Sequence, residues 1–183
     1  VGLIPLQAAQ HVHATLEVEK AAQGGAGAAY QPKFFNQHEW QTLRKLCEMI
    51  IPPDEKSQGG IAGGTAELID LMAGSDEKLQ VSFSGGLGWL DSQMRRRVGK
   101  AFIAATKDEQ RKILDLIAYR KNDSADLGPG IEFFSLIRKW TVDAFYSSKE
   151  GIEDVGFGGN EALSEYHGCG EDVVKQLLDR APV

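Results

Sequence analysis

The strongest constraint on the fold is a helical repeat of apolar residues that begins directly after a helix-capping motif. Asn36 precedes Glu39 by three residues, and this is the spacing of a capping box, in which each side chain accepts a hydrogen bond from the other residue's backbone N–H. Pro52 and Pro53 mark the other end, because proline cannot continue a helix. Between them we predict an amphipathic helix whose apolar residues recur every three or four positions: Trp40, Leu43, Leu46, Cys47 and Ile50.

Similar signals recur along the chain. Thr106 and Glu109 repeat the capping-box spacing, and Pro129 suits the first turn of a helix. No alternating pattern of apolar residues, which would indicate a strand, persists for more than a few positions. The sequence therefore predicts an all-α fold, an irregular bundle of five to seven helices with a loop-rich C-terminal extension. The further helices are expected over residues 65–74, 76–83, 87–98, 107–121 and 129–147, with a final amphipathic turn at 173–178.

The first 30 residues differ in composition from the rest. Residues 1–9 resemble the end of a secretory apolar segment, and residues 11–14 contain small side chains that suit a processing site, although no positively charged segment stands before them. They are consistent with the end of a signal peptide, with an extended arm on a partner, or with an ordinary mobile terminus. Residues 24–29 are a flexible glycine–alanine linker. We therefore expect an arm and linker over 1–30 and a helical domain over 31–183.

Composition narrows the classes of function. The chain of 183 residues is 42% hydrophobic, which is enough for one core, and its formal net charge of −6 comes with no basic stripe of the kind that binds nucleic acid. The three arginines at 95–97 lie at the end of a predicted helix, where their positive charges interact favourably with the negative end of the helix dipole. No apolar run reaches the length of about 18 residues that a membrane span needs.

The two cysteines, Cys47 and Cys169, are far apart and belong to no Cys-x-x-Cys or Cys-x-x-Cys-His pattern. This spacing excludes attached c-type haem and a classical zinc finger. In an oxidising compartment one bridge between them is possible, and two buried free thiols fit the spacing equally well.

Polar clusters that could support catalysis are incomplete. His38 and Glu39 are neighbours, but helical metal sites place their ligands one turn apart, and neither Glu-x-x-His nor His-Glu-x-x-His occurs. A capping or surface role is therefore favoured for His38. His167 lies two residues before Cys169, yet proximity in sequence does not make a catalytic dyad.

The glycine-rich stretch 156–160 superficially resembles a phosphate-binding loop. It follows a predicted helix instead of a strand, and it lacks the Gly-x-Gly-x-x-Gly spacing of dinucleotide sites. We therefore expect no flavin, nicotinamide or metal site in this chain. Its glycines instead suit a tight turn that approaches a partner closely.

Large aromatic residues surround this stretch in a manner typical of an interface centre. They supply contact area at low entropic cost, and the helix predicted over 129–147 is rich in them. A core helix followed by a long surface loop is the alternative interpretation. The candidates for a partner interface are Trp140, Phe145, Tyr146, Phe157, Asn160 and Tyr166.

Four stretches, taken in order, match the pattern of a known protein family. Residues 34–52 carry a phenylalanine, a His-Glu pair and an Ile-Ile-Pro helix end, and residues 62–70 carry a small-residue loop that leads to Leu-Ile-Asp. Residues 86–91 read Gly-Leu-Gly-Trp-Leu-Asp, and residues 133–169 carry an aromatic helix, a tyrosine–serine step, a glycine–asparagine turn and Gly-Cys. By these residues the chain resembles the gluconate 2-dehydrogenase subunit 3 family.

The resemblance implies a non-catalytic small subunit. Members of the family pair with a large FAD-dependent dehydrogenase of the glucose-methanol-choline type that oxidises sugars, sugar acids or glycosides, and a cytochrome c subunit with haem c often takes the electrons. The small subunit typically supplies the twin-arginine export signal for a partner that folds with its flavin in the cytoplasm. We therefore expect a bacterial periplasmic protein that binds, stabilises and helps to export such a flavoprotein.

Export would place both cysteines in an oxidising compartment. An intrachain bond between Cys47 and Cys169 is then one possibility, and a bond from Cys169 to the large subunit is the other. Two further classes of function compete with the subunit interpretation. They are a stand-alone periplasmic helical binding protein and a small enzyme that uses His38 and Glu39 or His167.

Overall fold

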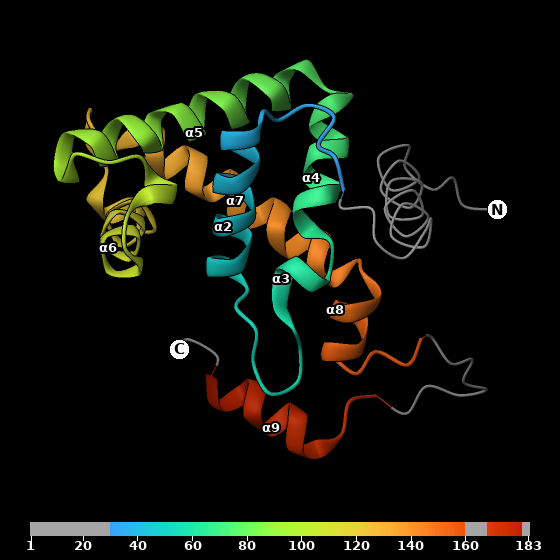
Figure 1. The fold of residues 1–183 in the computed structure, drawn as a ribbon. Coiled ribbons are helices and arrows are strands. Elements are labelled where there is room, and N and C mark those ends of the chain that lie inside the picture. The colour runs from blue at the N-terminus through green and yellow to red at the C-terminus, as the bar shows by residue number, and fades with distance from the viewer. Residues whose placement is uncertain (1–29, 160–167, 181–183) are drawn as a thin grey trace.

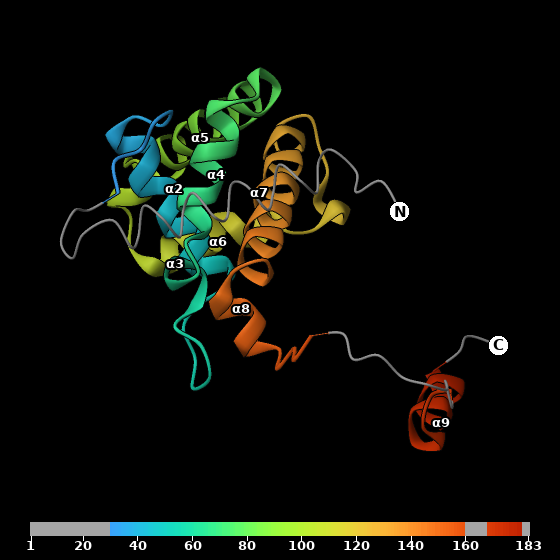
Figure 2. The same cartoon turned by 90° about the vertical axis from the view of Figure 1, so that its right-hand side faces the viewer.

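The computed structural model describes residues 30–159 and 168–180, and these residues form helices and connecting loops with no strand among them (Figures 1 and 2). The predicted all-α class is therefore confirmed. In this part of the chain the structure has two short 3-10 helices, η1 Phe102–Ala104 and η2 Arg120–Asn122. The α-helices are α2 Gln37–Ile50, α3 Gly59–Ala62, α4 Thr65–Gly74, α5 Glu77–Val98, α6 Lys107–Ile117, α7 Gly128–Tyr146, α8 Lys149–Asp154 and α9 Glu171–Arg180.

Helix α7 is central to the bundle. It packs against α2, α4, α5 and α6, and in Figure 1 it passes behind α2 before the chain turns into α8. Buried positions recur along α7 at helical spacing, from Ile131 through Ile137 to Phe145. These residues close a core to which the other helices contribute fully buried side chains: Leu43, Leu46, Ile69, Phe83, Leu90, Met94, Ile113 and Ile117.

The prediction of two short helices separated at residues 84–86 is wrong, because α5 runs through these residues as one continuous helix. The glycines inside it serve helix packing. A Cβ on Gly86 would lie 1.9 Å from a ring carbon of Phe133, so the absence of a side chain makes room for this α7 residue. The contact is mirrored on α7, where a Cβ on Gly130 would lie 2.1 Å from the ring of Trp89. Each helix thus provides a glycine that receives an aromatic ring of the other.

Both predicted capping boxes are confirmed. Asn36 Oδ1 accepts hydrogen bonds of 3.0 Å from the N–H groups of His38 and Glu39, and the Glu39 carboxylate accepts one of 3.2 Å from the Asn36 N–H. Thr106 and Glu109 make the same reciprocal pair at the start of α6. Each box satisfies N–H groups that a helix leaves unpaired at its first turn, which typically stabilises the helix by about 1 kcal/mol.

A buried carboxylate that the sequence analysis did not single out attaches the first described residues to the bundle. Asp70 of α4 is fully buried and accepts hydrogen bonds of 2.7–3.0 Å from the Tyr30 hydroxyl and from the backbone N–H groups of residues 33–35. Burial, followed by the hydrogen bond to Asp70, raises the pKa of Tyr30 above its ordinary value. Four donors on one carboxylate explain how a charge is accommodated in this core.

Candidate partner-binding surface

Exposed large apolar side chains are concentrated in the last part of the chain. Among the residues that the structure describes, eleven such side chains are exposed, and only Val81 and Tyr119 precede residue 142. Scattered exposed apolar residues are ordinary, whereas a contiguous apolar patch indicates a surface that another molecule covers, so we ask which of these residues are neighbours in the structure. The other nine are Val142, Tyr146, Ile152, Val155, Phe157, Val173, Val174, Leu177 and Leu178.

Four of these residues lie at the turn from α7 through α8, and we call them the α8 patch: Tyr146, Ile152, Val155 and Phe157. The turn is defined by Ser148, whose hydroxyl accepts a 3.1 Å hydrogen bond from the Gly151 N–H and donates one of 2.6 Å to the Phe145 carbonyl. A Cβ on Gly151 would lie 2.1 Å from that carbonyl oxygen. The glycine is therefore required for the chain to turn so tightly after α7.

Glu150 attaches α8 to the bundle. Its Oε1 accepts a 2.8 Å hydrogen bond from the Gln58 N–H and one of 3.4 Å from the Ser57 hydroxyl, both in the loop that follows α2. Close packing supports the turn as well, because a Cβ on Gly63 would lie 2.8 Å from the ring of Phe145. The α8 patch thus belongs to a packed and hydrogen-bonded part of the structure.

Two of the six predicted interface residues belong to this patch. Tyr146 is 45% exposed and Phe157 is 56% exposed, so both rings are accessible to a partner. Asn160 and Tyr166 lie outside the described residues.

The structure corrects the prediction that Phe145 belongs to a partner interface. It is only 1% exposed, because it lies one helical turn after buried Thr141 and two turns after buried Ile137. Its ring is a core element and is not available to a partner, and helical spacing was the signal that could have shown this. Trp140 is intermediate: it is partly buried against the core, and the Lys139 ammonium lies 5.7 Å from its ring centroid.

The structure does not contain the bond between Cys47 and Cys169, which was one of the two possibilities for these cysteines. Cys47 is fully buried on α2, and its Sγ lies 3.6 Å from the Thr141 hydroxyl of α7. Burial raises the pKa of the Cys47 thiol to about 11. Cys169 is exposed just before α9. The apolar stripe of α2 that carries Cys47 faces α7, so the core encloses this thiol and separates it from Cys169.

The residues considered for an enzyme have structural contacts. His38 Nε2 lies 2.5 Å from Asp91 Oδ2, and the other oxygen of Asp91 accepts a 2.8 Å hydrogen bond from the Phe102 N–H. Glu39 completes the capping box of α2. Asp91 is buried and accepts bonds from two separate segments, so His38 contributes to the attachment of α2 to α5 and η1. His167 lies outside the described residues.

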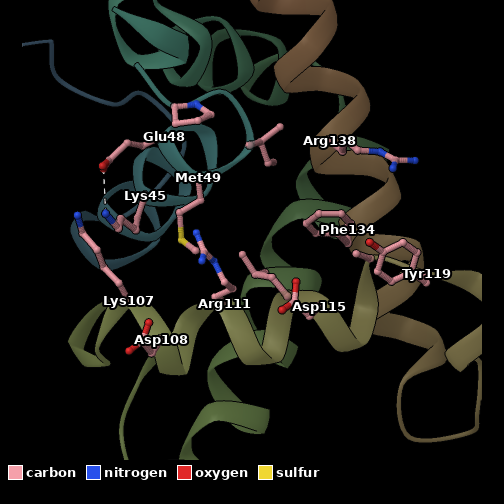
Figure 3. A pocket seen from close by; sticks show the side chains of 14 residues that line it. Lys45, Glu48, Met49, Lys107, Asp108, Arg111, Asp115, Tyr119, Phe134 and Arg138 are labelled. Atoms are coloured by element: carbon pink, nitrogen blue, oxygen red, sulfur yellow. Dashed lines mark hydrogen bonds and ion pairs between the residues drawn. The ribbon is translucent and has the colours of Figure 1, made fainter. Parts of the chain in front are cut away.

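A groove of about 600 Å³ lies between α2, α6 and α7, and Figure 3 shows its lining side chains. Met49, Leu114 and Phe134 provide apolar surface in it. Half of its lining residues carry a charge: seven of the fourteen are Lys, Arg, Asp or Glu. One ion pair in this set, between Lys45 and Glu48, has a separation of 3.0 Å. The groove therefore combines charged and apolar lining residues, whereas the α8 patch consists of apolar and aromatic ones.

Two further observations concern only the described part of the chain. No group of three or more His, Cys, Asp or Glu side chains in it is arranged to hold a metal ion. No helix in it is both long enough and apolar enough to cross a membrane.

The gluconate 2-dehydrogenase subunit 3 family matches residues 37–163 of the chain. The chain belongs to this family, which confirms the resemblance in its sequence motifs and makes it a subunit of a dehydrogenase complex. No curated protein and no solved structure matches the chain. The family match includes the bundle and the α8 patch, and it ends before α9.

Proposed function

We propose that this chain is the non-catalytic small subunit of an FAD-dependent dehydrogenase of the glucose-methanol-choline type, and that it binds and stabilises the large flavoprotein subunit. The α8 patch is the observation that carries the proposal. A family of dehydrogenase subunits must contact another chain, and the patch is an exposed apolar surface within the matched residues.

The physical character of the patch suits protein binding. Tyr146 and Phe157 offer large rings with few rotatable bonds, and such residues are common at the centres of interfaces. Ser148 and Glu150 hold the surrounding backbone in place before a partner arrives. A surface that is already ordered loses less entropy on binding, so more of its contact energy contributes to affinity.

The proposal extends to cofactor and compartment. FAD belongs to the large subunit, haem c to a third subunit, and the complex works in the bacterial periplasm after twin-arginine export. The support is the family resemblance together with residues 1–9, which resemble the end of a signal peptide. The glycine-rich residues 156–159 follow α8 instead of a strand, and this context is unlike a dinucleotide site.

A stand-alone binding protein is the second candidate. The groove between α2, α6 and α7 favours it, because a volume of about 600 Å³ lies within the usual range of small-molecule sites. The contacts of His38 with Asp91 and of Glu39 with Asn36 count against an enzyme that uses this pair, since both side chains already have structural partners.

Purification of the tagged chain from its own host tests the proposal. We expect a yellow flavoprotein to accompany it, and the complex to reduce a dye when sugars are supplied. The chain purified alone should show neither a flavin spectrum nor dye reduction. Flavin bound by the isolated chain, or sugar oxidation without a second subunit, would contradict the non-catalytic role. A chain that purifies without a flavoprotein and binds a small molecule would support the second candidate.

A further inference from the structure

The groove between α2, α6 and α7 gathers positive charge at one edge. Lys107 and Arg111 lie one turn apart on α6 and line the groove, and Lys45 lines it from α2. Figure 3 shows these three cationic side chains together toward the left of the view. Within the described part of the chain, Lys45 pairs with Glu48, whereas the side chains of Lys107 and Arg111 make no ion pair. Like charges repel one another, so an anion bound among them would be stabilised.

Lys45 is the cation that is most enclosed at this edge. Its side chain is 18% exposed, and its ammonium donates a 3.0 Å hydrogen bond to the Glu48 carboxylate. An ammonium has three N–H donors, and among the described residues Glu48 accepts the hydrogen bond of one of them. The other donors of Lys45 are therefore available to a ligand in the groove.

The opposite end of the groove is aromatic. Phe134 and Tyr119 line it there, and Met49 and Leu114 add apolar surface between the two ends (Figure 3). The groove is thus amphipathic along its length, with cations at one end and rings at the other. Its volume of about 600 Å³ lies in the usual range of small-molecule sites.

Two further carboxylates limit the charge of a ligand. Asp108 and Asp115 also line the groove from α6, so the whole lining has an excess of only one positive charge. Asp115 lies one turn beyond Arg111, on the way to Tyr119 (Figure 3). Its carboxylate would repel negative charge placed near the aromatic end. The lining therefore suits a ligand with a single negative charge at one end and an uncharged ring at the other.

We propose that this groove is a binding site for a small aromatic carboxylate. The carboxylate lies among Lys45, Lys107 and Arg111, and the ring covers the apolar surface of Met49 and Phe134. The lining residues include none of the α8 patch. The site is therefore separate from the proposed contact with the flavoprotein, and a ligand and a partner chain would not compete for the same side chains.

Calorimetric titration of the full chain with naphthoate tests the ligand class. We expect one site with a dissociation constant below about 1 mM, which is ordinary for a ligand of this size. The neutral methyl ester should bind about 10-fold more weakly, because it loses the charge-assisted hydrogen bonds. Gluconate has the same charge without a ring, and it should also bind about 10-fold more weakly because it leaves the apolar floor exposed to water.

A matched pair of variants tests the location. Arg111→Gln removes one cation from the site, and Lys112→Gln removes the neighbouring exposed cation of α6, which is not among the lining residues. We expect Arg111→Gln to weaken naphthoate binding by about 10-fold and to leave binding of the methyl ester unchanged. Lys112→Gln should bind both ligands as the wild type does. Circular dichroism of each variant checks that its helix content is unchanged.

Several outcomes would overturn the inference. Absence of naphthoate binding, or equal binding of naphthoate, its ester and gluconate, would show that the groove is no site for this class of ligand. Equal weakening by Arg111→Gln and Lys112→Gln would mean that naphthoate responds only to the general charge of α6. Stronger binding after Leu177→Asp with Leu178→Asp would show that α9 occupies the groove instead. None of these results bears on flavoprotein binding, which the purification described above tests separately.

Discussion

Helices α6 and α9 are both strongly amphipathic, yet α6 buries its apolar stripe and α9 exposes it. Ile113, Leu114 and Ile117 of α6 are 1–7% exposed, whereas the four apolar residues of α9 are 41–71% exposed. Both helices have acidic residues in the first turn, where negative charges interact favourably with the positive end of the helix dipole. The difference therefore lies in what surrounds each helix.

Helix α6 is positioned by specific contacts. A capping box begins it, α7 packs against it, and the Gln110 side chain donates a 2.8 Å hydrogen bond to the carbonyl of Phe102 in η1. Helix α9 lies beyond the family match. The comparison teaches that an amphipathic pattern locates an apolar stripe on a helix, but does not show whether the rest of the chain covers that stripe.

The largest expected effect is a loss of stability from substitution of Phe145, and it contrasts with the effect expected for its neighbour Tyr146 at the end of α7. Phe145→Ala should lower the free energy of unfolding by about 3–5 kcal/mol, because it leaves a cavity in the core. Tyr146→Ala, like Phe157→Ala, should instead weaken binding of the flavoprotein by more than about 1 kcal/mol and leave the helix content unchanged. Chemical denaturation followed by circular dichroism, with affinity measured for each variant, distinguishes the two effects. Unfolding of the free Tyr146→Ala chain would show that this ring also belongs to the core.

The comparison of α6 with α9 can be tested directly. Ile117→Ala in α6 should lower the free energy of unfolding by about 2–5 kcal/mol. Leu177→Ala in α9 should change it by less than about 0.5 kcal/mol, since its side chain is exposed in the free chain. Urea denaturation of both variants provides the measurement. Equal losses would mean that α9 packs against the bundle in solution.

A smaller change in stability is expected when glycines on two faces of α5 are replaced by alanine. Gly86→Ala should destabilise the fold by about 1–3 kcal/mol, because the added methyl group overlaps the ring of Phe133. Gly88→Ala should stabilise it by about 0.5–1 kcal/mol, because a Cβ there meets no atom within 4 Å and alanine favours a helix. Thermal denaturation of the pair gives the sign of each change. Stabilisation by Gly86→Ala would contradict the close approach of α5 and α7.

The smallest expected effect concerns the two cysteines, whose thiols should differ in their reactivity. At pH 8 a maleimide should label Cys169, which is exposed, and should reach Cys47 only after denaturation. Since burial raises the pKa of Cys47 from 9.0 to about 11, its contribution to stability is complete below pH 9.0 and is lost as the pH rises toward about 11. Cys47→Ala should remove this part of the alkaline decline. Labelling of both thiols in the folded chain would contradict the burial of Cys47.

The complex allows a further check on Cys169. If this residue is bonded to the large subunit, non-reducing electrophoresis of the purified complex should show one band at the summed mass. Separate bands would exclude that bond.

The sequence predicted features that depend on nearby residues. Asn36 with Glu39 and Thr106 with Glu109 marked the starts of α2 and α6 correctly, because a capping box forms within four residues. The glycines of α5 were misinterpreted as a break. A glycine within a helix looks the same in sequence whether it ends the helix or receives a ring such as Phe133 from another helix.

The candidate surface was predictable only in part. Tyr146 and Phe157 were identified from the aromatic content around a glycine-rich turn, and both are exposed. Phe145 was included for the same reason, although its helical spacing from Ile137 places it in the core. The stripe of α9 was visible as an amphipathic turn, but its exposure was not.

By itself the sequence determined the helical class, the capped starts of α2 and α6, and membership in the gluconate 2-dehydrogenase subunit 3 family. These follow from hydrogen bonding and side-chain periodicity over a few residues and from motifs in a set order. Only the tertiary structure decided that Asp70 holds the first described residues, that Cys47 is enclosed, and that α9 remains uncovered. The physical reason is that burial depends on which distant segments meet, and no local pattern specifies that choice.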